Sequence, residues 1–173
     1  MEEKTQRRSQ YMRMLLIGLL AVAIILGANT VFERRHTAIP PLPKEVSQKL
    51  LFSAHLPSKL PPGFTINSAS YTFREGALLY TAQSTHGDTI VFSEQDPPKE
   101  IDATQFYETN IKNPVHLSGA HLRTVFGQQL NGKGFIAGIT TDDDTWVLLT
   151  SSSQLSKNDV KGISNGLQKQ HTD

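Results

Sequence analysis

Cysteine is absent from this chain of 173 residues. Its absence excludes a disulfide framework, a zinc site with thiolate ligands, a cysteine nucleophile and a lipid-modified cysteine. An excess of one charge is also missing. Four of the 17 basic and two of the 16 acidic residues precede the first apolar run, which leaves 13 against 14 and a net charge of −1 in the rest. Because nonspecific affinity for nucleic acids comes from neutralising phosphates, we expect no nucleic-acid partner.

One long segment carries no charge. Residues 14–32, MLLIGLLAVAIILGANTVF, contain only two clearly polar side chains. At 1.5 Å per residue this segment spans roughly 28 Å as a helix, close to the hydrocarbon thickness of a bilayer, and it predicts an N-terminal transmembrane helix. A cleaved signal peptide and a buried helix of a soluble protein are the alternatives. Cleavage after Ala28 would place Leu26 at the −3 position, where a small residue is typical.

The charges around this segment leave its orientation open. Four Lys and Arg residues lie on each side of it within about 18 residues, so the positive-inside rule gives a tie. A short charged lead, an apolar run and a long C-terminal part are together typical of a signal-anchor. We therefore expect a single-pass protein of the cell membrane. Residues 1–13 form a short cytoplasmic tail, residues 14–32 contact the lipid bilayer, and the C-terminal domain is extracytoplasmic.

Residues 33–63 are expected to form a Pro-rich spacer. Three prolines in ERRHTAIPPLP favour an extended chain, and Pro43 can open a short helix over KEVSQKLLF. A second Pro-rich stretch ends in Pro62-Gly63, which suits the centre of a type II turn. The folded extracytoplasmic domain is therefore expected over residues 64–170.

Within this domain, alternating apolar residues and frequent Thr, Tyr, Val, Ile and Phe predict strands. The expected strands cover residues 66–73, 77–82, 89–93, 123–130, 135–141 and 145–151. Asn131-Gly132 between two apolar runs is a strong hairpin signal. Trp146 is expected in the core beside Phe92, Phe135 and Leu148.

Two helix starts interrupt these strands. Asp102 can cap a helix that ends near Asn110, with Ile101 and Phe106 in contact across its start. Ser156 can cap a second helix, with Asp159 at the third position. The apolar face of that helix consists of Val160, Ile163 and Leu167.

The resulting order is βββα-βββα, an α+β fold with an antiparallel sheet of about six strands and two packed helices. We expect both helices on one face of the sheet, with the other face open to solvent or a partner. The strands that precede the helices begin alike, DTIVF at 88–92 and DTWVL at 144–148. Either an internal duplication or chance explains this similarity.

Two apparent motifs do not fit the chemistry that they suggest. Residues 162–166, GISNG, match the G-x-S-x-G nucleophile motif, but Ser164 lies inside an expected helix and too little chain follows it for the remaining triad. Residues 127–134, GQQLNGKG, are one residue short of a P-loop. Gly134 stands where a Ser or Thr would hold Mg²⁺, and a strand follows instead of a helix.

The remaining polar residues give no catalytic, cofactor-binding or metal-binding assignment. The six histidines, none of which forms an i, i+4 pair, are His36, His55, His86, His116, His121 and His171. A turn could bring His116 and His121 together, but no third ligand is evident. Asp142, Asp143 and Asp144 are expected to form a solvated turn, with a weak Ca²⁺ contact as the alternative. Glu94 and Asp96 cannot be placed across a cleft from the sequence.

The sequence resembles a group of uncharacterised bacterial membrane-anchored proteins. Their external domain of unknown function is similar to one attached to some anti-sigma-type membrane proteins. The resemblance covers roughly residues 56–169. Its marks are the Leu-Pro-x-Gly-Phe opening (residues 60–64), the TIVFSEQ strand (89–95) and the Leu-Ser start of the last helix (155–156). The 13 residues before the apolar run are too few for a sigma-binding domain, which argues against a direct transcriptional role.

Together these features predict a non-enzymatic binding, sensing or envelope-interaction module. Its partner would be an envelope component or another membrane protein. The alternative is an envelope hydrolase or transferase whose active site the sequence does not disclose.

Overall fold

The computed structural model describes residues 39–97, 102–117, 122–130 and 134–170. The chain divides into two compact units, 1–37 and 38–173, and the described residues belong to the second. The expected tail (1–13) and transmembrane helix (14–32) lie outside the described residues. Among the residues that are described, no helix is long and apolar enough to cross a bilayer.

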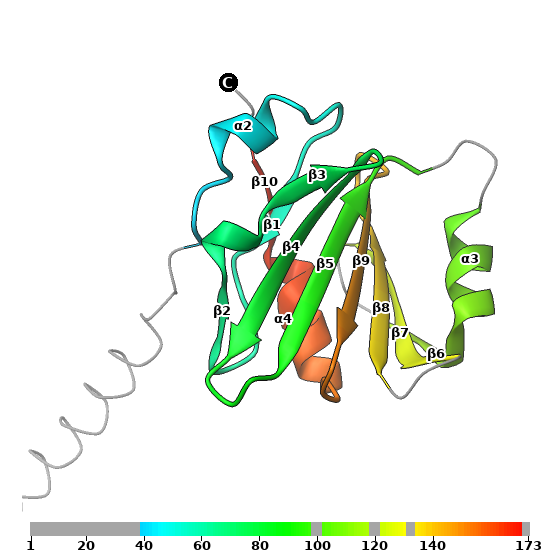
Figure 1. Ribbon diagram of the computed structural model, residues 1–173. Helices are drawn as coiled ribbons and strands as arrows, with labels where there is room; N and C mark the ends of the chain where they lie inside the picture. The colour runs from blue at the N-terminus through cyan, green and yellow to red at the C-terminus, as the bar shows by residue number, and fades with distance from the viewer. Residues whose placement is uncertain (1–38, 98–101, 118–121, 131–133, 171–173) are drawn as a thin grey trace, which may run out of the picture. The chain divides into compact units, whose positions relative to one another are not determined.

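The described residues form one eight-stranded antiparallel sheet and one two-stranded antiparallel sheet (Figure 1). The strand order in the larger sheet is β2-β4-β5-β9-β8-β7-β6, and β3 also pairs with β4. The strands of this sheet are β2 (Phe64–Ile66), β3 (Thr72–Arg74), β4 (Ala77–Ser84), β5 (Thr89–Gln95), β6 (Ile111–His116), β7 (Arg123–Gln129), β8 (Phe135–Thr140) and β9 (Trp146–Ser151). The smaller sheet pairs β1 (His55–Pro57) with β10 (Leu167–Lys169).

The helices in the described part of the chain are short. They are α2 (Lys44–Ser47), the 3-10 helix η1 (Ser68–Ser70), α3 (Ala103–Asn110) and α4 (Lys157–Gly166). The predicted caps of the two longer helices are confirmed. Asp102 accepts a hydrogen bond from the Gln105 amide, and Ser156 and Asp159 form a reciprocal capping box. The α+β class and the antiparallel sheet are therefore as the sequence predicts. The expected contact of Ile101 with Phe106 and the expected hairpin turn at Asn131-Gly132 lie outside the described residues.

The first expected strand is interrupted. The Asn67 side chain accepts a hydrogen bond from the Ala69 amide at 3.0 Å, and this local bond begins η1. Because a side chain that satisfies nearby backbone competes with sheet pairing, residues 66–73 do not form one strand and are split between β2 and β3. At the opposite edge, β6 is a strand that the sequence does not predict. It contains Pro114, a positive φ of 52° at Asn113 and a register shift, which together hide the usual strand pattern.

The last expected helix stops earlier than predicted. It ends at Gly166, so Leu167 begins β10 instead of extending the helix. The Gly166 carbonyl accepts a hydrogen bond from the Ser58 amide at 2.6 Å. Gly166 also lies close to the Lys59 backbone, and a Cβ at position 166 would be only 3.0 Å from the Lys59 nitrogen. β10 then pairs with β1, and Leu56 of β1 is fully buried. Part of the segment expected to be a spacer therefore contributes to the core.

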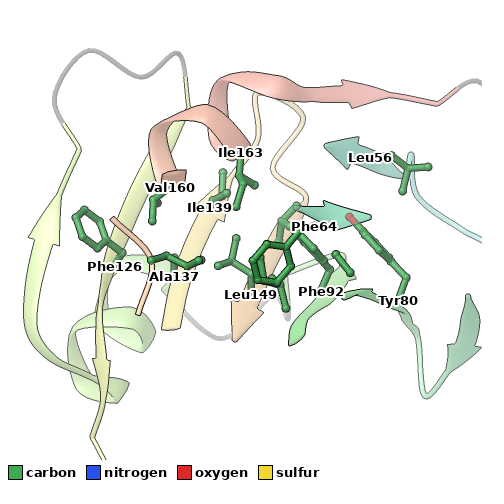
Figure 2. Packing of buried hydrophobic residues seen from close by; sticks show 14 of the residues in the cluster. Leu56, Phe64, Tyr80, Phe92, Phe126, Ala137, Ile139, Leu149, Val160 and Ile163 are labelled. Carbon is green, nitrogen blue, oxygen red and sulfur yellow. The ribbon is translucent and has the colours of Figure 1, made fainter. Parts of the chain in front are cut away.

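The two longer helices lie on opposite faces of the large sheet, so the expectation that both share one face is wrong. Val160 and Ile163 of α4 are fully buried in one cluster with Ala137 and Ile139 of β8 (Figure 2). On the other face, Tyr107 of α3 packs in a separate cluster with Ile136, which is also on β8. The reason is visible in β8, where all six residues are buried. A strand without a polar face needs cover on both sides.

The two similar segments are neighbours in the sheet. β5 pairs with β9 antiparallel, with Phe92 opposite Leu149. The hairpins β4–β5 and β8–β9 therefore meet along these two strands. The helices that follow them depart to opposite faces, which makes the halves unequal. Duplication and chance both remain compatible with this arrangement.

The packing of α3 can be tested at Gly138 of β8. A Cβ at this position would overlap the ring of Tyr107, which also packs against Trp146 at a centroid distance of 5.7 Å. We expect Gly138→Ala to lower the free energy of unfolding by about 1–3 kcal/mol, because an overpacked site forces its neighbours to move. Urea denaturation of the 38–173 unit measures this change.

Gly162 of α4 provides the matched control. A Cβ there meets no neighbouring atom within 4 Å. Gly162→Ala should therefore raise the free energy of unfolding by about 0.5–1 kcal/mol, the difference in helix propensity. Equal stability of Gly138→Ala and the parent protein would contradict the placement of α3 on this face.

Candidate functional site

A cavity of about 360 Å³ lies where β1, β10 and the β8–β9 turn meet. Parts of the chain that are far apart in the sequence converge on it. Its lining residues are His55, Leu122, Thr141, Asp142, Asp143, Leu167 and Lys169. The volume is at the lower end of the range for small-molecule sites, and the mixture of apolar walls and a few charged groups is typical of such sites.

Asp143 connects the three sides of this cavity. One carboxylate oxygen accepts the Thr141 hydroxyl at 2.6 Å and lies 3.3 Å from Nε2 of His55. The other accepts Nζ of Lys169 at 2.9 Å. Partial desolvation acts to raise the pKa of Asp143, but these three groups outweigh it and hold the pKa at about 2. Asp143 is therefore an anion that fixes the turn to β1 and β10.

His55 forms the inner wall and is only 7% exposed. Desolvation by burial lowers the pKa of its ring, and the nearby Asp143 carboxylate and Ser53 backbone only partly oppose this effect. The neutral form is therefore favoured at pH 7. Because Nε2 faces Asp143, we assign the proton to Nε2, and Nδ1 is then a hydrogen-bond acceptor. Nδ1 is buried and has no side-chain partner among the described residues, and a backbone hydrogen bond of the ring involves Ser53.

A buried acid lies beneath His55. Glu94 of β5 is fully buried, and its carboxyl group accepts the His55 amide at 2.7 Å and the Tyr80 hydroxyl at 2.8 Å. Desolvation raises the pKa of Glu94 to about 8, although the two hydrogen bonds act to lower it. The carboxyl group is therefore mostly protonated at pH 7. Glu94 does not line the cavity, and its role is to hold the backbone of the residue that does.

A second, smaller cavity of about 60 Å³ lies under α3. Phe106 and Tyr107 meet Trp146 there at centroid distances of 5.8 and 5.7 Å. Trp146 is 5% exposed, which confirms its expected place in the core, but it lies with Leu148 on the sheet face opposite Phe92 and Phe135. This cavity is too small for an organic ligand.

The two apparent sequence motifs are structural. Ser164 lies within α4, is 1% exposed and shares a hydrogen bond of 2.7 Å with the Thr124 hydroxyl. It is therefore no exposed nucleophile. Gly127 and Gln129 lie in β7 and Gly134 directly precedes β8, whereas residues 131–133 lie outside the described residues. The described residues of these two segments do not line the 360 Å³ cavity.

Away from this cavity, the described histidines and acidic residues form one long, exposed contact, between His116 and Glu108 at 3.7 Å. His86 and His116 are exposed, whereas His36, His121 and His171 lie outside the described residues, so the possible pairing of His116 with His121 is not described. Glu94 points into the core and its neighbour Asp96 is exposed, so they do not face each other across a cleft. Within the described ranges, no three His, Asp or Glu side chains converge as metal ligands.

The sequence does not predict the contacts among His55, Asp143 and Lys169. The three Asp residues are all exposed, as expected for a solvated turn, but Asp143 also bonds to two other segments. The contacts form because β1 pairs with β10, a pairing between three-residue strands. A usable signal is the buried acid at Glu94, placed in a strand position that faces the core.

Comparisons with known proteins give no assignment. The chain matches no protein-family model, no curated protein and no solved structure. The resemblance to membrane-anchored proteins with an anti-sigma-type external domain therefore stays a prediction. The candidate site rests on its geometry alone.

The buried acid gives a pH dependence. The pKa of Glu94 is about 8 in the folded protein against 4.5 for an unperturbed Glu side chain, so the folded state binds this proton more tightly. The contribution to stability is complete below about pH 4.5 and is lost as the pH rises to about 8. The loss is on the order of a few kcal/mol at about 1.4 kcal/mol per pKa unit.

Glu94→Gln tests this dependence, because an amide keeps the shape and an acceptor for the His55 amide but does not titrate. Urea denaturation between pH 5 and 9 should show a shallower loss of stability than in the parent protein. Asp96→Asn, an exposed position on the same segment, is the control and should leave the slope unchanged. An equal slope in Glu94→Gln and the parent would contradict the assignment.

Asp143 should have the opposite dependence on pH. Its folded-state pKa of about 2 lies below the value of 3.8 for an unperturbed Asp side chain, so its contribution to stability is present above about pH 4 and is lost as the pH falls toward 2. Because the side chain is 33% exposed, we expect Asp143→Asn to cost only about 1 kcal/mol at pH 7. Asp144→Asn is the control, since its ion pair with Arg123 is long and exposed. A cost that persists at pH 2 would argue against an electrostatic role.

Proposed function

We propose that this protein is a single-pass membrane protein whose extracytoplasmic domain is a non-enzymatic binding or sensing module. The cavity lined by His55 and Asp143 is its ligand site. The apolar run at residues 14–32 supports the anchor. The partner is an envelope component or another membrane protein that reaches the cavity.

The proposal rests on the contacts of the two ring nitrogens of His55. A histidine that activates a nucleophile hydrogen-bonds to it with one ring nitrogen while a carboxylate orients the other. Here Nε2 faces Asp143, but no described hydroxyl is hydrogen-bonded to Nδ1. Among the described lining residues, the hydroxyl of Thr141 donates to the Asp143 carboxylate instead. These groups support binding better than covalent catalysis.

The alternative is an envelope hydrolase or transferase. The His55–Asp143 pair within a cavity favours it, because a base with an orienting carboxylate is part of many active sites. It would require a nucleophile or activated water next to Nδ1. A turnover activity abolished by His55→Gln with unchanged ligand binding would favour this alternative.

The location can be tested by labelling, because the chain has no native cysteine. Single cysteines are introduced at Ser9, before the apolar run, and at Lys161, an exposed position on α4. In intact cells, a membrane-impermeant maleimide should label Lys161→Cys only, and both variants should react after permeabilisation. The full-length chain should also remain in membranes after a carbonate wash. Labelling at Ser9→Cys alone, or release by carbonate, would overturn the proposed location.

A further inference from the structure

One half of the large sheet has a face that neither α3 nor α4 covers. Buried and less buried residues alternate along β4 and β5, and the antiparallel register aligns the less buried ones across β4, β5 and β9. On this side of the sheet α3 packs on β6, β7 and β8, and α4 packs on the opposite side. We call these positions the open face. They are Ala77, Leu79, Thr81, Gln83, Thr89, Val91, Ser93, Gln95, Leu148 and Thr150.

The open face carries no charge, since none of its ten side chains is ionisable. A protein surface is about 25–35% charged, so about three charged side chains would be expected among ten solvated positions. Arg74 of β3, opposite Ala77, lies only at the rim. Depletion of charge within a polar rim is typical of a surface that a partner covers.

Such a face is suited to contact with a copy of itself. A symmetric dimer brings the same patch together from both chains, so a charged patch would meet its own sign, whereas the open face has no such penalty. Val91 lies at its centre, opposite Thr81 of β4 on one side and Thr150 of β9 on the other. This side chain is 40% exposed. A central apolar residue is where the binding energy of an interface concentrates.

The size of the face indicates how strong this contact is. β2 and β3 along the edge of β4 extend the face to four strand widths, and β4 has eight residues. The usual strand spacing and rise then give on the order of 500 Å² per copy. Two copies bury roughly 1,000 Å², the lower limit for a specific interface. The contact is weak in solution, and confinement of both copies to one membrane raises their effective concentration. Its strength therefore rests on the proposed anchor.

We propose that the open face is a dimer contact, which binds the open face of a second copy of this chain in the same membrane. The anchor and the spacer are identical in the two copies, so both present this face at the same distance from the bilayer. Val91 and Leu79 supply apolar contact, and the Thr, Ser and Gln side chains supply hydrogen bonds. None of the ten residues lines the cavity at His55 and Asp143, so the dimer contact and the ligand site use different residues.

Other occupants fit the open face less well. Charged lipid headgroups and a charged protein surface would meet no counter-charge there. A small ligand would need an enclosing cavity, and the 60 Å³ cavity that shares Ser93, Gln95 and Leu148 with this face is too small. A different protein with a neutral surface is distinguished from a second copy by the mass of a crosslinked product.

Crosslinking through single cysteines tests the inference, because the chain has no native cysteine. Val91→Cys lies at the centre of the open face. Lys161→Cys, at an exposed position on α4, is the matched control on the other side of the sheet. A short bismaleimide is used, since packed sheets lie about 10 Å apart and a disulfide cannot span that distance. In isolated membranes, Val91→Cys should give at least about fivefold more product of twice the chain mass than Lys161→Cys.

A charge at the centre of the open face should prevent the contact. Thr81→Glu, combined with Val91→Cys, brings like charges together in the symmetric dimer and should lower the yield at least about fivefold. Asn158→Glu on α4 adds the same charge on the other side of the sheet and should leave the yield unchanged. Coexpression of the Thr81→Glu and Thr81→Lys chains, both with Val91→Cys, should restore the yield, which a misfolded variant would not do.

Three results would overturn the dimer contact. They are equal yields from Val91→Cys and Lys161→Cys, an unaltered yield in Thr81→Glu, and a product that joins this chain to a different protein.

These results are separable from a failure of the proposed function. If the chain stays in membranes after a carbonate wash and Val91→Cys gives no dimer, the dimer contact is wrong and the tethered module stands. If carbonate releases the chain, or if Ser9→Cys alone is labelled in intact cells, the proposed location is wrong. A crosslink at Val91→Cys that Thr81→Glu abolishes would still establish the dimer contact.

Discussion

The attachment of β1 to the large sheet depends on a carboxyl group buried in the core. One carboxyl oxygen of Glu94 accepts a hydrogen bond from the His55 amide of β1, and the other accepts one from the Tyr80 hydroxyl. A buried acid without partners would be strongly unfavourable, and these two bonds with a raised pKa make its burial tolerable. The backbone of β1 is thereby held to β5 through a side chain, without a strand ladder between them.

The cavity follows from this attachment. Once β1 is fixed, its pairing with β10 places Lys169 opposite His55. Asp143 can then contact both side chains from the β8–β9 turn. The Ser58 amide and hydroxyl add two bonds to the Gly166 carbonyl, which join the end of β1 to the end of α4. Three distant parts of the sequence thus enclose one site, and the acid beneath them is part of its support.

The sequence predicts those features that depend on local chemistry. The helix caps at Asp102 and Ser156 are examples, because a side-chain oxygen and an amide three residues later suffice to define them. The longer strands are predicted for the same reason, since alternation is visible within each segment. β1 and β10 have three residues each and no such pattern, so only their tertiary pairing defines them.

The placement of the helices shows a second limit. Each helix has an apolar face, but the sequence does not say which side of the sheet that face meets. The information lies in β8, whose six buried residues require cover on both sides. Gly138 is the local mark of this requirement, because the missing side chain leaves room for the ring of Tyr107. Such a mark can be interpreted only once the partner helix is known.

The β8–β9 turn places a carboxylate that has structural contacts next to one that has none. Asp143 points toward β1 and β10 and is held at a low pKa by its three contacts, so its charge is committed to the fold. Asp142 is one residue away, exposed and without such contacts. Asp144 adopts a positive φ of 62°, a conformation that Asp tolerates and that helps the chain to reverse direction. A change at Asp142 therefore alters the charge at the cavity and leaves the contacts of Asp143 in place.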